Sequence, residues 1–220
     1  MTTLNKELIY VGDPMCSWCY GFAPAKRKLE EQCAGRAVTT LVVGGLHIDW
    51  TEPQDAQRKK FLDEHWHEIG ERSSQPFKFD ILERDDFVYN TEPACRAAVT
   101  AREMQGNVVA LNFFTHLQGA FYAENQDVTQ ENVLIDLAAD FGLDKAEFAK
   151  LLPTDEFKQK TMQDFQFAQR LGVSGFPTVV VNDENGYAYL TVGFQPYENL
   201  EAIVEAWLTG QLQRDQSAAE

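Results

Sequence analysis

Two cysteines separated by two residues are the strongest chemical signal in the sequence. Cys16 and Cys19 form a Cys-Ser-Trp-Cys motif that follows a short apolar run, Leu8–Val11, and precedes a helical pattern. A thiolate is the reactive form of cysteine, and free N–H groups at a helix N-terminus stabilise its negative charge. We therefore expect Cys16 to be the attacking thiol. Cys19, one turn inside the helix, would then displace the mixed disulfide and release the product.

Half of a zinc site is the alternative interpretation of such a motif, and the remaining ligand types disfavour it. A structural zinc site normally has a second ligand pair at compatible spacing. Cys33 and Cys95 are far apart in the sequence, and His65 with His67 form only a short His-x-His. We therefore predict redox chemistry without a metal or another cofactor. Cys33 and Cys95 are interpreted as packed thiols, because free cysteine is commonly buried.

The elements around the motif predict a strand, a helix and a second strand. Leu8–Val11 is an apolar run ended by Gly12 and Pro14, as in a buried strand. Residues 25–33 have a helical pattern that Gly35 is placed to end. A helix that begins near Cys16 would contain Pro24. Val38–Val43 reads as the second strand, so the opening is a βαβ unit with a parallel pair.

From residue 52 to residue 170 strand patterns nearly disappear, and apolar residues recur at helical spacing. Thr91 offers a helix cap, and Asp144 starts a capping-box spacing. Strands return at 178–181 and 187–192 around an Asn/Asp/Gly turn, which predicts an antiparallel hairpin. A last amphipathic helix follows, and the polar tail 211–220 is expected to fray. The predicted apolar helix faces include Phe61, His65 and Ile69; Ala94, Ala97, Ala98 and Ala101; Ala110, Phe113, Phe114 and Leu117; Leu134, Leu137, Ala138 and Phe141; and Leu200, Ile203, Val204 and Trp207.

Composition and charge restrict the function classes. The chain has 220 residues, 44% of them hydrophobic and 24% charged, which is an ordinary globular composition. Nineteen Lys and Arg residues against 34 Asp and Glu residues give a net charge of −15. Such a surface repels phosphate backbones and anionic membranes, so we expect neither a nucleic-acid nor a membrane partner. We find no secretory-signal pattern and no apolar stretch of about 18 residues, and therefore expect a cytoplasmic protein.

A second motif, Gly175-Phe-Pro-Thr178, precedes the predicted hairpin. A proline just before an apolar strand fits either a cis bond in a tight turn or a trans proline at the strand's first position. Together with the Cys-Ser-Trp-Cys motif at a strand–helix junction, it resembles the thioredoxin superfamily. The long helical segment between the two motifs resembles the DsbA branch. Asp13 to Phe22 looks most similar to the cytoplasmic DsbA-like proteins of the protein-disulfide-isomerase and FrnE type.

This resemblance implies an α/β protein with a thioredoxin-like fold and a large all-helical insertion. Residues 1–51 and 171–220 would form the two halves of the thioredoxin-like domain, and residues 52–170 the insertion. Cys16 would be the attacking thiol, Cys19 the resolving one, and the pair a redox-active disulfide. Pro177 would face them as a cis-proline, and the Phe176 backbone would help to hold an extended substrate. Trp18, between the cysteines, is expected near the active surface.

The predicted activity is thiol–disulfide exchange that reduces, forms or isomerises disulfides in protein or glutathione-like substrates. DsbA itself has Pro-His between its cysteines, where this chain has Ser17 and Trp18, so an equally depressed thiol pKa does not follow. Asp13 is close in sequence, yet its position after the strand does not favour a buried proton acceptor. One alternative comes from the same fold, a glutathione-dependent transferase or isomerase of the kappa type, which Cys16 disfavours. Another comes from a non-enzymatic class, a chaperone-like or polyketide-pathway binding protein with a vestigial redox site.

Overall fold

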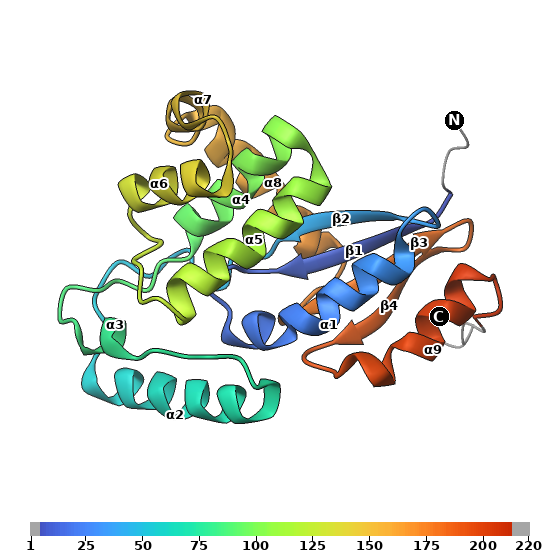
Figure 1. Cartoon of the computed structure of the whole chain (residues 1–220), viewed down its shortest axis with the longest axis horizontal. Coiled ribbons are helices and arrows are strands. Elements are labelled where there is room, and N and C mark those ends of the chain that lie inside the picture. Colours follow the sequence, from blue (N-terminus) through green and yellow to red (C-terminus); the bar gives the residue numbers. More distant parts are fainter. Residues whose placement is uncertain (1–4, 213–220) are drawn as a thin grey trace.

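A four-stranded sheet carries both motifs (Figure 1). The computed structural model describes residues 5–212, so the expectations for the extreme N-terminus and for the tail beyond residue 212 lie outside the described part. The strand order is β2-β1-β3-β4. The strands are β1 (Glu7–Gly12), β2 (Val38–Val43), β3 (Thr178–Asp183) and β4 (Gly186–Val192). β1 pairs parallel with β2 and antiparallel with β3, and β3 with β4 forms the hairpin. The predicted βαβ unit and the predicted hairpin are therefore confirmed.

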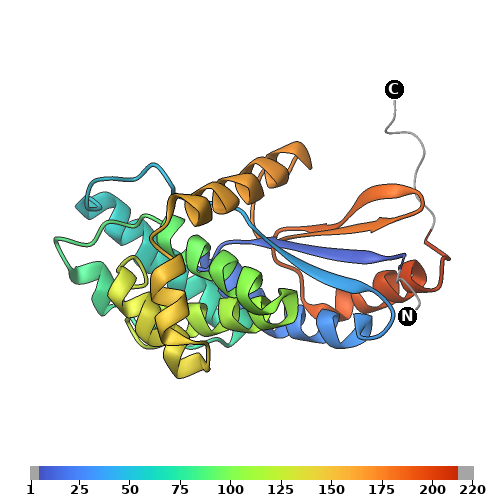
Figure 2. The same ribbon diagram turned by 90° about the horizontal axis from the view of Figure 1, so that it is seen from above.

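Helices cover both faces of this sheet (Figure 2). Helices α1 (Ser17–Cys33) and α9 (Glu201–Leu208) lie on one face, and α8 (Asp155–Arg170) lies on the other. Successive residues of a strand point to opposite faces. Leu8 and Tyr10 accordingly join the large core with α1 and α9, whereas Ile9 and Val11 pack with Ala168 of α8.

The remaining helices of the insertion follow β2; α5 runs beside α1 and contacts β2, and the others lie towards the end of the sheet where α1 begins (Figure 1). They are α2 (Ala56–Ser73), α3 (Asp80–Glu83), α4 (Glu92–Gln105), α5 (Asn107–Tyr122), α6 (Glu131–Phe141) and α7 (Lys145–Leu151), and the short helix η1 (Tyr197–Asn199) precedes α9. With α8 they form the helical insertion of a mixed α/β thioredoxin-like fold, as predicted. Among residues 5–212, no helix combines the length and the apolar character needed to cross a bilayer.

Most local predictions hold, and two apolar faces need correction. Pro24 lies inside α1, which starts directly after Cys16, and Asp144 caps α7 through the Glu147 N–H. Phe61 in α2 is 59% exposed and Ile203 in α9 is 37% exposed. Each stands at the margin of its apolar stripe, and the neighbouring elements cover only the centre of that stripe. Leu200, Val204 and Trp207 are buried as expected.

An ion pair closes the free edge of β2. Arg102 of α4 binds both carboxylate oxygens of Asp164 of α8, at 2.7 and 2.9 Å. Arg102 also donates to the Leu41 carbonyl, and the Val43 N–H donates to Asp164. Unpaired edge groups otherwise invite pairing with another chain. The pair therefore satisfies the backbone of β2 and joins two helices of the insertion to the sheet.

We predict that Arg102→Met destabilises the protein by about 3–5 kcal/mol, because it leaves the mostly buried Asp164 carboxylate without its cation. Urea unfolding followed by circular dichroism measures the change in the free energy of unfolding. Arg36→Met is the matched control, because Arg36 makes an equally short two-bond contact with Glu205 in an exposed position. Equal losses in the two variants would contradict the structural role given to Arg102.

Candidate functional site

The sulfur of Cys16 lies at the N-terminal end of α1. Cys16 is the N-cap residue, and its sulfur accepts the Cys19 N–H at 3.4 Å. The Cys16 N–H donates to the Asp13 carbonyl at 3.0 Å, which fixes the turn that leads into the helix. Cys16 is 5% exposed and Cys19 is fully buried. The Cys19 N–H thus points at the Cys16 sulfur, at the helix end where backbone N–H groups lack intrahelical partners.

The second thiol is held in the protonated form. Burial raises the pKa of Cys19 well above its ordinary value, and the neighbouring Cys16 raises it further. The hydroxyl of Tyr10, on β1, lies against the Cys19 thiol and acts in the opposite direction on this pKa. Within the described chain, this buried hydroxyl has no hydrogen bond of ordinary geometry. The two thiols therefore differ in surroundings, with Cys19 on the inner side of the pair.

The second motif faces the first. The Cys16 thiol donates to the Phe176 carbonyl at 3.7 Å between sulfur and oxygen, and the Phe176–Pro177 bond is cis. The Phe176 ring packs directly on Gly44, just after β2, where a β-carbon would lie 2.1 Å from the ring. Only glycine leaves room for this contact. Segments 160 residues apart in the chain thus meet at one sulfur atom.

Trp18 is only partly exposed. Its ring packs edge-to-face on His65 of α2, with 5.5 Å between centroids, and against Phe194 at the same distance. The Arg72 guanidinium covers the ring at 5.0 Å. The indole is therefore near the cysteines, as expected, but it is anchored by α2 and by the segment after β4. Among the described residues, no three His, Cys, Asp or Glu side chains come together as a metal-binding group.

Asp13 is a site residue whose burial the sequence did not indicate. It is fully buried, and its carboxylate accepts the Met15 N–H at 2.8 Å and the Leu46 N–H at 2.7 Å. The thiol of Cys95, buried as predicted, donates to the same carboxylate at 3.3 Å. Burial raises the pKa of Asp13, although these hydrogen bonds oppose the shift. Its only sequence signal was a polar residue at a strand end, three positions before Cys16.

Side chains of the insertion complete the turn. Tyr89 and Tyr122 both donate to the Met15 carbonyl. Thr91, predicted to cap α4, makes no cap hydrogen bond; its hydroxyl accepts the His47 N–H at 3.2 Å instead. The hydroxyl serves the chain that follows β2 because this chain crosses the start of α4. The insertion therefore takes part in shaping the residues next to Cys16.

We predict that His47 makes the fold sensitive to mild acid. Burial, together with the Arg58 charge, lowers the His47 pKa from 6.5 to about 4, while Asp49 acts in the opposite direction. Between these values the unfolded chain binds more protons, so this contribution to stability is present above pH 6.5 and is lost as the pH falls towards 4. Urea unfolding at pH 7 and pH 5 should show a smaller loss for His47→Phe than for the unsubstituted protein. Equal losses would contradict the assignment.

Comparisons with known proteins identify the family and the fold. A family model described as thioredoxin matches residues 9–202. A structure from Nitrosomonas europaea, described as a candidate protein disulfide isomerase, is 33% identical, covers 94% of this chain and 98% of its own, and gives a TM-score of 0.87. The cytosolic disulfide reductase DsbM from Pseudomonas aeruginosa is 24% identical, with a TM-score of 0.76 over 92% of this chain and 98% of its own.

Relatives found by sequence are named as protein adapters and not as disulfide oxidoreductases. The ClpXP adapter protein SpxH of Bacillus subtilis (strain 168) is 26% identical over 173 residues, which are 79% of this chain and 57% of the relative. This chain therefore spans less than two thirds of that protein's length. The match over residues 9–202, the sheet order and the dithiol at the start of α1 agree with one another. This protein belongs to the thioredoxin family, in a DsbA-like form with a helical insertion.

Proposed function

We propose that the protein is a thiol–disulfide oxidoreductase in which Cys16 is the attacking thiol and Cys19 the resolving one. The observation that carries the proposal is the position of the Cys16 sulfur, between the helix N–H of Cys19 and the carbonyl of Phe176. A thiolate in this place is stabilised by the helix and stands beside a backbone segment that an extended substrate can approach.

The chemistry follows from the order of the two thiols. The Cys16 thiolate attacks one sulfur of a substrate disulfide, so a Cys16–substrate disulfide forms and the other substrate sulfur leaves as a thiolate that takes up a proton. Cys19 then loses its proton and attacks the Cys16 sulfur. The substrate leaves with two electrons as a dithiol, and Cys16 and Cys19 become a disulfide. The reverse sequence oxidises a substrate dithiol.

Small thiols are candidate substrates beside proteins. The structure of DsbM from Pseudomonas aeruginosa has also been described with GSH, and with this chain it gives a TM-score of 0.75 at 24% identity. We propose a cytoplasmic location for this activity, by analogy with DsbM, which is described as cytosolic. Trp18, Phe176 and Pro177 are proposed to border the bound substrate, with the Phe176 backbone as its polar contact.

Cys19→Ser should accumulate mixed disulfides, because the thiol that normally displaces Cys16 is absent. Non-reducing electrophoresis after incubation with oxidised substrate protein measures the adducts, and insulin reduction measures turnover. We expect turnover to fall to background in both Cys16→Ser and Cys19→Ser, with adducts only in the latter. Cys33→Ser is the matched control, with turnover retained. Full insulin reduction by Cys16→Ser would refute the mechanism.

The four thiols should react with iodoacetamide in a defined order. Cys16 should be alkylated first, because it is the one cysteine at a helix N-terminus, while Cys19, Cys33 and Cys95 are fully buried. Burial also raises the pKa of Cys33 to about 11 and the pKa of Cys95 well above its ordinary value, which suppresses their thiolates. Peptide mass spectrometry after brief labelling of the reduced protein identifies the site. Earlier labelling of any other cysteine would contradict this order.

A protein adapter is the second candidate function, and the name of the SpxH relatives favours it. An adapter holds its partner by surface contacts and needs no sulfur chemistry. Cys16→Ser separates the two functions, because it removes thiol–disulfide exchange and leaves the surface unchanged. A partner captured equally well by the unsubstituted protein and by Cys16→Ser, in the presence of a reductant, would favour the adapter function.

A further inference from the structure

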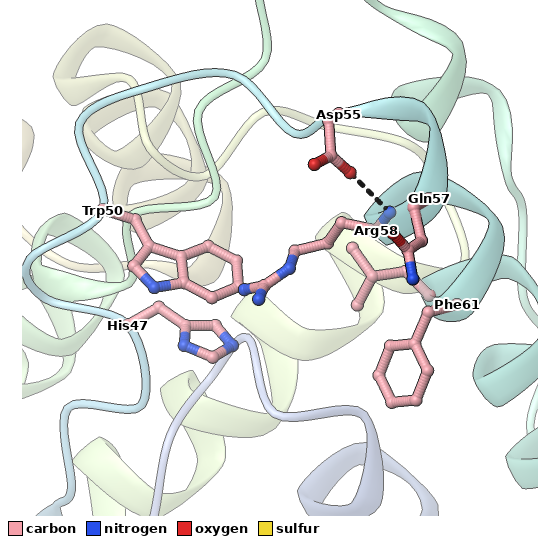
Figure 3. A pocket seen from close by; sticks show the side chains of 7 residues that line it. His47, Trp50, Asp55, Gln57, Arg58 and Phe61 are labelled. Carbon is pink, nitrogen blue, oxygen red and sulfur yellow. Dashed lines mark hydrogen bonds between the residues drawn. The ribbon is translucent and has the colours of Figure 1, made fainter.

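A cavity of about 480 Å³ lies between the chain that follows β2 and the first turns of α2 (Figure 3). We propose that this cavity binds the carboxylate-bearing part of a small peptide disulfide, with the Arg58 guanidinium as the group that pairs with the carboxylate. The proposal rests on the proposed function, because it places one sulfur of the ligand at Cys16. Cavities of this volume are typical of small-molecule sites.

The walls of the cavity combine aromatic rings with the Arg58 cation and the Asp55 carboxylate. Figure 3 shows the Arg58 side chain reaching across to Trp50, with His47 beside the indole. The guanidinium lies 4.3 Å from the centre of the indole, and the His47 and Trp50 rings stack at 3.6 Å. Phe61, 59% exposed, forms the far wall. A ligand with an aliphatic portion and one charged end fits these surroundings.

The positive charge of the Arg58 guanidinium is available to bind an anion. Across residues 5–212 its guanidinium forms no ion pair with a carboxylate, and it lies over the indole of Trp50. Burial and the neighbouring Arg58 charge lower the pKa of His47 to about 4, so His47 is neutral at pH 7 and serves as a hydrogen-bonding group. An arginine stacked on an aromatic ring presents its N–H edge for a two-bond contact with a carboxylate.

The charges at the N-terminus of α2 favour a carboxylate over a phosphate as the bound anion. Phosphate groups commonly use the free N–H groups of a helix N-terminus. Here the Asp55 carboxylate already accepts the backbone N–H of Arg58 at 2.8 Å, drawn as the dashed line in Figure 3. This fixed negative charge repels a doubly charged phosphate more than it repels a single carboxylate, and it leaves Arg58 as the anion-binding group. The charges therefore favour a carboxylate.

The residues that line the cavity are linked to the turn between β1 and α1, which carries Cys16. Leu46, the neighbour of His47, donates its N–H to Asp13, three residues before Cys16. On the opposite side, Phe61 stacks on His65 at 5.5 Å, and His65 packs on Trp18. On one side the cavity thus adjoins the turn that carries Cys16, and on the other the residue between the two cysteines. We infer from these contacts that a tripeptide-sized ligand holds its carboxylate end at Arg58 and directs its sulfur towards Cys16.

Titration of the Cys16→Ser variant with glutathione disulfide, followed by NMR, tests the site without any chemical step. We expect saturable binding that shifts the indole N–H signal of Trp50 more than those of Trp66 and Trp207. Arg58→Gln should raise the Kd by about tenfold, the loss of affinity expected for one charge-assisted contact. Arg58→Lys should recover part of the lost affinity. Arg27→Gln, which removes an exposed arginine of α1, is the matched control.

Three results would overturn the site: no binding to Cys16→Ser, a Kd that changes less than twofold in Arg58→Gln, or inorganic phosphate binding at Trp50 more tightly than glutathione disulfide. A separate assay keeps the proposed function distinct. Bis(2-hydroxyethyl) disulfide carries no charge for Arg58 to hold, so its reduction by the unsubstituted protein reports on Cys16 chemistry alone. Reduction of this neutral disulfide without binding of glutathione disulfide would refute the site and leave the oxidoreductase assignment intact.

Discussion

The turn between β1 and α1 depends on the buried carboxylate of Asp13. It accepts backbone N–H groups from Met15 and Leu46 and the thiol of Cys95, so it joins the end of β1, the chain after β2 and helix α4 at one point. A buried carboxylate persists only where its lone pairs are satisfied. The position of the Cys16 sulfur at the start of α1, and every contact of that sulfur, therefore depends on this network.

The difference between the two thiols arises from this position. Cys16 receives the N–H of Cys19 and faces the carbonyl of Phe176, whereas Cys19 points into the core beside Tyr10. Burial penalises the charged form of Cys19, whereas Cys16 lies at the N-terminal end of α1. This difference is the basis for the proposed roles of Cys16 as attacking thiol and Cys19 as resolving thiol, and neither Ser17 nor Trp18 between them is titratable.

The helical insertion is part of the site. It supplies Tyr89 and Tyr122 to the Met15 carbonyl, and its helix α2 anchors Trp18 through His65. It also seals the edge of β2 through the ion pair of Arg102 and Asp164, so the sheet and the insertion stabilise each other. The cavity at Arg58 lies where the insertion leaves the sheet. The insertion therefore supports the turn that carries Cys16 and also lines the cavity proposed to bind substrate.

The sequence by itself determined the dithiol, the βαβ unit, the hairpin and the helical character of the insertion, because two-residue cysteine spacing and hydrophobic periodicity are local properties. The division at residues 51/52 and 170/171 stays a prediction. Only the tertiary structure decided that Asp13 is buried, that the hydroxyl of Thr91 binds His47 instead of capping α4, and that Phe61 borders a cavity instead of joining the core. Each of these depends on groups that are distant in the sequence, such as Leu46 and Cys95 around Asp13. The burial and the hydrogen-bond partners of a polar side chain depend on residues that are distant in the sequence, and a local sequence pattern does not contain that information.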